Sequence, residues 1–169
     1  MAHHYLLCVG SLAKGSNFDN SMITREVPYW GLSKRLSNDA INAAIAKGED
    51  VAIWLRGTKP SCMAKYGNER LLGVFIVKSI TKRQLGPLIA LEPNDKELGW
   101  TDGKWEYVIN YSKYYDISAL DFGGPACFGL RNHGMSMFTQ PKNYFPKGVE
   151  RFDKLLPLLP FIGCIKKYS

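Results

Sequence analysis

The fold class is decided by residues 37–55, which read SNDAINAAIAKGEDVAIWL. Ser37 is a favourable helix N-cap, and Asp39 places an acidic side chain in the first turn, where the helix dipole stabilises it. Apolar side chains at helical spacing form one stripe, which consists of Ala40, Ile41, Ala44 and Ile45. Gly48 supplies a C-terminal stop. The segment therefore predicts a helix that begins after Ser37 and leads directly into Val51 to Leu55.

Strands are expected on both sides of this helix. Val51 to Leu55 alternates, with Ile53 on one face and Trp54 on the other. Three further apolar or alternating runs predict strands: Tyr5 to Val9, Arg70 to Ile80 and Trp105 to Tyr111. Strands thus outnumber helices, and the connections are too short for repeated β-α-β units. This order predicts an α+β fold, built as a curled mixed β-barrel with flanking helices.

The chain is 169 residues long, which suits a single domain with a terminal extension. Residues 1–145 are expected to form the domain. Residues 146–169 are expected to form a C-terminal extension, which either packs on the domain or leads to a following domain. Phe152 to Ile162 is apolar but contains Pro157 and Pro160, so any helix in that segment is expected to be short.

The composition is that of an ordinary globular domain with a basic charge. Hydrophobic residues make up 46% and charged residues 22% of the chain. No apolar run approaches the ~20 residues that span a bilayer, and the four cysteines show no CxxC spacing. Reduced thiols, a cytoplasmic location and no membrane association are therefore expected. The net charge is +7, with most of the excess between Phe122 and Ser169, which suits nucleic acid; a merely soluble basic surface is the alternative.

The motifs of common catalytic and cofactor sites are absent. The sequence contains no HExxH, no GxSxG nucleophile elbow, no GxxxxGK(S/T) phosphate loop and no GxGxxG after a strand. The three histidines and four cysteines do not stand at ligand spacing, and the carboxylates are scattered. No catalytic residue, metal or cofactor is therefore expected, and binding without catalysis is the favoured class.

Two tryptophans that follow no apolar period are candidates for ligand recognition. Trp30 and Trp100 each stand beside a glycine in an expected loop. Trp54 and Trp105 belong to expected strands and are expected in the core. Loop tryptophans either cover the core or form the walls of a pocket, where an aromatic face stacks on a base at about 1–3 kcal/mol. The polar loop after the first strand offers side chains for the edge of a base, namely Ser11, Asn17 and Asn20.

The order of these segments resembles the opening of a YTH domain, and it is similar to that of the EVE domains, which are PUA-like as well. The matching segments are Tyr5-Leu6-Leu7, the polar loop, Tyr29-Trp30-Gly31, the helix, Asp50 to Trp54, and Gly67 with Leu72-Gly73-Val74. The resemblance covers about residues 5 to 143, as an order of elements. It implies a PUA-like fold and the recognition of a flipped, modified base.

The resemblance also implies roles for individual residues. In these families one wall of the methyl-base cage is a tryptophan just before the first helix, and another comes from a later loop. The corresponding residues here are Trp30 and Trp100, with Tyr29 beside the first of them. The basic segment that contacts phosphate in the family looks like Gly129 to Gly134, which supplies the phosphate-binding candidates Arg131 and Asn132, and Lys142 follows nearby as a third candidate.

The expected function is therefore recognition of a modified base in nucleic acid, with N6-methyladenine in DNA as the first expectation and 5-methylcytosine as the second. Similar PUA-like domains also form the N-terminal targeting modules of McrB-type restriction systems, so the resemblance implies an AAA+ GTPase domain and a nuclease subunit as partners. An RNA-binding YTH-like domain is one alternative. A protein-interaction domain with structural tryptophans is another, and an enzyme acting on a base is the third.

Overall fold

The structure is a computed structural model. It describes residues 2–9, 12, 28–32, 38–57, 62, 65–67, 70–82, 107–120 and 152–167.

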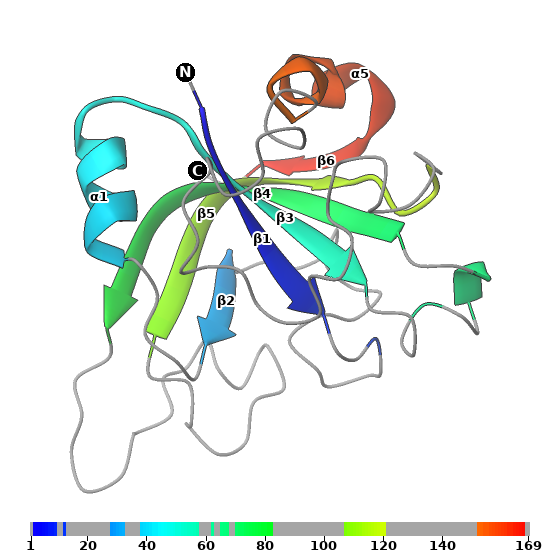
Figure 1. The fold of residues 1–169 in the computed structure, drawn as a ribbon, viewed down its shortest axis with the longest axis horizontal. Helices are drawn as coiled ribbons and strands as arrows, with labels where there is room; N and C mark the ends of the chain where they lie inside the picture. Colours follow the sequence, from blue (N-terminus) through cyan, green and yellow to red (C-terminus); the bar gives the residue numbers. More distant parts are fainter. Residues whose placement is uncertain are drawn as a thin grey trace, which may run out of the picture.

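One curved sheet carries the fold (Figure 1). Its strands are β1 (His3–Val9), β2 (Tyr29–Leu32), β3 (Val51–Gly57), β4 (Arg70–Lys82), β5 (Tyr107–Asp116) and β6 (Cys164–Lys167). The order is β1-β3-β4-β5-β2, with β6 also paired to β5. The β1–β3 pair is parallel and the other pairs are antiparallel. The expected α+β class is confirmed.

The sheet is not closed into a barrel. Its main path ends at β1 on one side and at β2 on the other, and no strand pairing among the described residues joins these two edges. The expectation of a curled mixed β-barrel is therefore met only as a curled mixed sheet in the described part of the chain. The mixed pairing and the curl were predicted correctly, because β1, β3, β4 and β5 carry strong apolar periods.

Strand β5 pairs with β4 along one edge and with two short strands, β2 and β6, along the other edge. Its first half pairs with β2, where Trp30 stands opposite Ile109. Its second half pairs with β6, where Lys113 stands opposite Lys167. Register shifts near Val77 interrupt the ladder between β4 and β5. Such bulges increase local twist and bend, which lets this long strand pair curl across the molecule.

The helix α1 (Asn38–Ala46) confirms the prediction made from the opening segment. Ile41 is fully buried on its apolar stripe. The Asn42 side chain fixes the helix to β4, because its amide donates to the Ile80 carbonyl (2.9 Å) and its carbonyl accepts from the Ile80 N–H (3.0 Å). Gly48 ends the helix with a φ of 77°, a left-handed conformation that favours glycine.

The sheet buries side chains on both faces, so there are two cores. The first core lies under β2 and α1, and its members include Tyr5, Leu7, Trp30, Ile41, Ile53, Leu55, Phe75, Tyr111 and Tyr114. The second core lies on the opposite face, and its members are Leu6, Ala52, Trp54, Leu71, Val74, Tyr115, Ile117, Phe152 and Leu159. The predicted alternation of Ile53 and Trp54 in β3 is confirmed, because these neighbours belong to different cores.

The C-terminal segment covers the second face of the sheet. Its elements are the 3-10 helix η3 (Leu156–Leu158), the short helix α5 (Leu159–Ile162) and β6. Residues 152–162 are helical throughout, but only in short pieces, because residues 152–155 form one turn before η3 and Pro157 and Pro160 stand at the beginnings of η3 and α5. Figure 1 shows α5 and α1 far apart, next to different parts of the sheet. The expected domain boundary after residue 145 lies outside the described residues.

The close approach of Tyr114 to β4 gives a stability prediction. A Cβ at Gly73 would overlap with the hydroxyl and ring of Tyr114. We expect Gly73→Ala to destabilise the protein by about 1–3 kcal/mol, the usual cost of overpacking. Urea unfolding measures this cost. In a Tyr114→Ala background the same substitution should cost much less, and an equal cost in both backgrounds would contradict the steric explanation.

Candidate nucleic-acid interface

Trp30 lies in a strand, not in the loop expected from its neighbouring glycine. It is the second residue of β2, and its side chain is only 4% exposed. The indole packs on the Phe75 ring with 5.3 Å between centroids and 57° between planes. Trp30 is thus part of the first core. The sequence did not indicate this, because a four-residue strand between Pro28 and residue 33 is too short to show a period.

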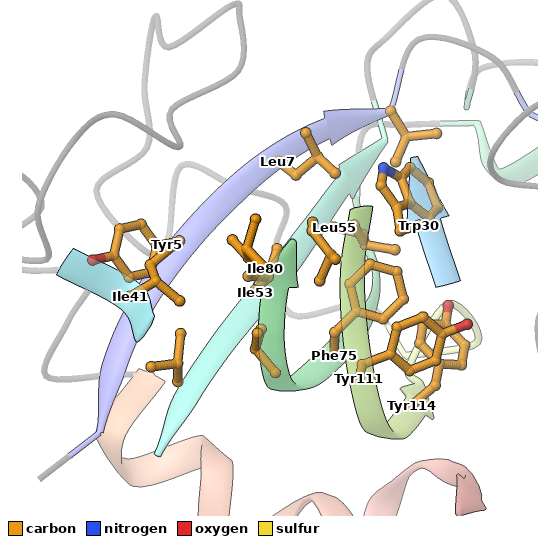
Figure 2. Packing of buried hydrophobic residues seen from close by; sticks show 14 of the residues in the cluster. Tyr5, Leu7, Trp30, Ile41, Ile53, Leu55, Phe75, Ile80, Tyr111 and Tyr114 are labelled. Atoms are coloured by element: carbon orange, nitrogen blue, oxygen red, sulfur yellow. The ribbon is translucent and has the colours of Figure 1, made fainter. Parts of the chain in front are cut away.

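Four aromatic rings meet where β2 crosses the first core. Phe75 is at the centre, stacked on Tyr111 (4.4 Å, 16°) and tilted against Tyr114 (5.4 Å, 48°). Figure 2 shows Trp30 from β2 above Phe75, with the two tyrosine rings on its other side. We call Trp30, Phe75, Tyr111 and Tyr114 the aromatic cluster. Because the rings come from three strands, their neighbours hold them in place.

A second aromatic group lies between β3 and β4. The half-buried Tyr66 packs against the first core. The Lys65 ammonium lies 5.2 Å and the Arg70 guanidinium 4.6 Å from the Tyr66 ring centroid. Arg70 also donates to the Ser118 carbonyl at 2.8 Å, which fixes its orientation. A ring beside two cations offers both stacking and phosphate attraction.

This basic aromatic group was missed in the sequence. The segment from Gly57 to Glu69 is rich in Gly, Pro and Lys, and it predicts only a hairpin loop. The available signal was the spacing of Lys65, Tyr66 and Arg70, which places two cations within four residues of one ring. Spacing alone does not show that the cations approach the ring, because the loop conformation decides this.

Most of the predicted site residues cannot be placed. Outside the described residues lie Ser11, Asn17, Asn20, Trp100, Arg131, Asn132 and Lys142. For Tyr29 the structure describes the backbone, which pairs opposite Asn110 in β2. From the polar loop that follows β1 only Leu12 is described, and it packs against the first core. The structure therefore places Trp30 in the aromatic cluster, and its role as a cage wall stays a prediction like the rest of the cage.

A buried hydrogen-bonded chain ties the C-terminal segment to the second core. The Trp54 indole N–H donates to Nδ1 of His4 (3.1 Å), so the hydrogen of the neutral imidazole is on Nε2, which donates to the Asp153 carboxylate (2.7 Å). The His4 side chain is 1% exposed. Phe152 stacks on Trp54 at 4.4 Å. The predicted core position of Trp54 is confirmed, and the neighbouring histidine acts as a linker between the two segments.

Few described groups have shifted pKa values. Burial raises the pKa of the Tyr5 and Tyr115 hydroxyls. A hydrogen bond from His3 lowers the pKa of the Glu49 carboxyl, against the opposing effect of burial, and it links the beginning of β1 to the turn before β3. All three shifts move the group further from neutral pH.

The described residues show neither a metal-ligand cluster nor a membrane-spanning helix. Within the described ranges, no three His, Cys, Asp or Glu side chains are grouped to hold a metal ion. The helices placed by the structure include none that is long and apolar enough to cross a membrane. The thiol of Cys62 is buried.

Comparison with known proteins gives no family. No protein-family model matches the chain, and neither a curated protein nor a solved structure matches it.

Proposed function

We propose that this chain is a PUA-like nucleic-acid-binding domain that reads a flipped, modified base without catalysing a reaction. One observation carries the proposal: the Tyr66 ring lies beside the cations of Lys65 and Arg70 and packs against the core that contains the aromatic cluster. The net charge of +7 supports a polyanionic ligand. The open, curled sheet is compatible with a PUA-like fold.

In this proposal the basic aromatic group binds the nucleic-acid strand. Lys65 is exposed and attracts a phosphate, which contributes salt-dependent affinity. Arg70 is held by the Ser118 carbonyl, so its planar guanidinium has a fixed orientation from which it reaches a phosphate or stacks on a base. Stacking of this kind stabilises a bound base by about 1–3 kcal/mol.

The modified base is read beside Trp30. Trp30 is only 4% exposed, so a base reaches the indole only where a neighbouring group moves aside, while Phe75 holds the indole on one side. Trp100 supplies the opposite wall. Burying the methyl group of N6-methyladenine between such walls contributes about 0.8 kcal/mol. The base edge is bound by the polar loop after β1, where Asn17 and Asn20 offer donors and acceptors.

The proposal also includes the phosphate contacts, the choice of polymer and the partners of the domain. Arg131, Asn132 and Lys142 contact phosphates of the bound strand, and DNA is favoured over RNA. The domain acts in the cytoplasm as the targeting module of a McrB-type complex with an AAA+ GTPase domain and a nuclease subunit. An RNA-binding YTH-like domain has the same site with the other polymer.

A second candidate function is that of a protein-interaction domain. It is favoured by the burial of both described tryptophans, since Trp30 is 4% and Trp54 is 0% exposed. The contribution of each tryptophan to the stability of its core is sufficient to explain why it is present. The first function requires a nucleic-acid ligand and the second a protein ligand, so a measurement of oligonucleotide binding distinguishes them.

The salt dependence of oligonucleotide binding tests the proposed contact between Lys65 and a phosphate of the nucleic acid. We expect Lys65→Ala to weaken binding to every oligonucleotide and to reduce the slope of log affinity against log salt by about 1, because one phosphate contact is lost. Fluorescence anisotropy of labelled single strands at several salt concentrations measures this slope.

Lys47→Ala is the matched control, because Lys47 is equally exposed but follows α1, outside the basic aromatic group. The control should keep the wild-type slope. Equal losses in both variants would indicate only a diffuse effect of net charge, and they would contradict a specific contact at Lys65.

A further inference from the structure

The C-terminal segment exposes large apolar side chains. Leu158 is 51% exposed, Phe161 86%, Ile162 38% and Ile165 36%. We call these four residues the C-terminal apolar surface. They belong to η3, α5 and β6, which are adjacent elements at the end of the described chain. Contiguous apolar patches mark interaction sites, whereas single exposed residues need no explanation.

The four side chains belong to one side of the molecule. Leu158, Phe161 and Ile162 follow the i, i+3, i+4 spacing of one helical face. Leu159 between them is fully buried in the second core, so α5 rests on the sheet by its other face. In β6, Ile165 pairs with Tyr115, which also belongs to the second core. Ile165 therefore lies on the face of the sheet that α5 covers.

The border of this surface is positively charged. Lys113 and Lys167 stand directly opposite each other in β5 and β6, one row beyond the pair of Tyr115 and Ile165. Like charges in this arrangement repel and destabilise the strand pair. An anionic group between these lysines would relieve the repulsion, so the charge is complementary to carboxylates.

The described carboxylates near this surface are engaged within the fold. Asp116, at the end of β5, accepts hydrogen bonds from the Ser118 N–H (2.9 Å) and hydroxyl (2.6 Å). Asp153 accepts from His4 in the second core. Both carboxylates are thus held by hydrogen bonds within the fold, and Lys113 and Lys167 are the described charges beside Ile165 on its face of the sheet.

We propose that the C-terminal apolar surface is a docking site for a segment of a partner protein that presents apolar side chains flanked by carboxylates. Phe161 is the anchor, and its exposed ring packs against apolar side chains of the partner segment, in the way that a central aromatic side chain dominates many interfaces. Ile162 and Ile165 receive an apolar side chain of the partner. The carboxylates of the partner lie between Lys113 and Lys167.

The exposures favour a protein over a bilayer or a second copy of this chain. Phe161 protrudes, but Ile162 and Ile165 are only about one third exposed, so a complementary surface is needed to cover all of them, which a planar bilayer does not provide. A second copy would bring its own lysines to the lysines of the first. Such like-charge contacts oppose self-association.

The test uses defined peptides and the full chain. The probe is a short fluorescent peptide of alternating leucine and glutamate, and the matched peptide has lysine in place of glutamate. We expect the acidic peptide to bind and the basic peptide not to bind. Phe161→Ser should weaken binding of the acidic peptide about tenfold, and Lys167→Glu should weaken it similarly. Ala43→Ser, an exposed change on α1, is the matched control and should leave binding unchanged.

Protein stability is measured for every variant, because Phe161→Ser should leave thermal unfolding unchanged at an exposed position. Equal binding of both peptides, or acidic-peptide binding that survives both surface variants, would overturn the proposal. It would also be overturned if Phe161→Ser removed binding to phosphatidylserine vesicles or removed a concentration-dependent dimer, with no effect on the peptide. The proposal would also be overturned if a single-stranded oligonucleotide displaced the acidic peptide by binding at Lys167, because the surface would then be a nucleic-acid site.

Discussion

Replacement of Trp54 by alanine is expected to destabilise the protein by about 3–5 kcal/mol, the range for truncating a large buried aromatic side chain. Trp54 is fully buried in the centre of the second core. The substitution removes its stack on Phe152 and its hydrogen bond to His4 at once. Because Phe152 and Asp153 attach the C-terminal segment to the sheet, the loss should also loosen that segment.

Chemical unfolding in urea measures the loss, and the matched variant is Trp54→Phe. Phenylalanine keeps an aromatic ring against Phe152 but cannot donate to His4, so we expect an intermediate loss. Amide hydrogen exchange should show faster exchange at Leu159 and Ile162 in Trp54→Ala than in wild type. A loss below about 1 kcal/mol for Trp54→Ala would show that this packing is not formed.

The second large effect is expected at Trp30. Trp30→Ala should cost about 3–5 kcal/mol, because the indole is 4% exposed and packs on Phe75. The same variant would therefore lose binding through unfolding, and binding data on it alone would not identify a cage wall. Trp30→Phe keeps an aromatic ring against Phe75 and should cost less than the alanine variant.

The two substitutions at Trp30 are compared by thermal unfolding and by oligonucleotide binding. We expect Trp30→Phe to remain folded and to lose preference for a methylated base, while its salt-dependent binding through Lys65 and Arg70 persists. Wild-type stability of Trp30→Ala would contradict the buried position of the indole. Unchanged base preference in a folded Trp30→Phe variant would contradict its role as a wall of the cage.

The elements that were predicted correctly are those with long apolar periods. The helix α1 has a cap, a stripe and a stop within its own sequence, and β1, β3 and β4 have runs that are apolar or alternate. The strand β5 was expected to end at Tyr111 but continues to Asp116, because β6 pairs with its second half. Such an extension depends on a partner that is distant in the chain.

The two missed strands are both short. β2 and β6 have four residues each, and neither shows a period by itself. Both form because β5 offers an edge to them, which is a long-range pairing that local propensity does not encode. The expected loop position of Trp30 was wrong for this reason.

For the candidate site, the sequence predicted the kinds of residues but not which of them lie together. The sequence indicates many aromatic residues and a basic charge, but the aromatic cluster joins residues from β2, β4 and β5. Which rings meet depends on the curl of the sheet and on the room that Gly73 leaves for Tyr114. The basic group around Tyr66 likewise depends on the conformation of one loop.

The most direct test of the proposed function is fluorescence anisotropy at fixed low salt with matched oligonucleotides. The set comprises DNA and RNA strands with adenine, N6-methyladenine, cytosine or 5-methylcytosine. The proposal predicts about fourfold tighter binding to DNA with N6-methyladenine than to the unmodified strand, since burial of one methyl group contributes about 0.8 kcal/mol. The preference should disappear in folded Trp30→Phe. Equal binding to all strands, or no binding, would contradict a modified-base reader.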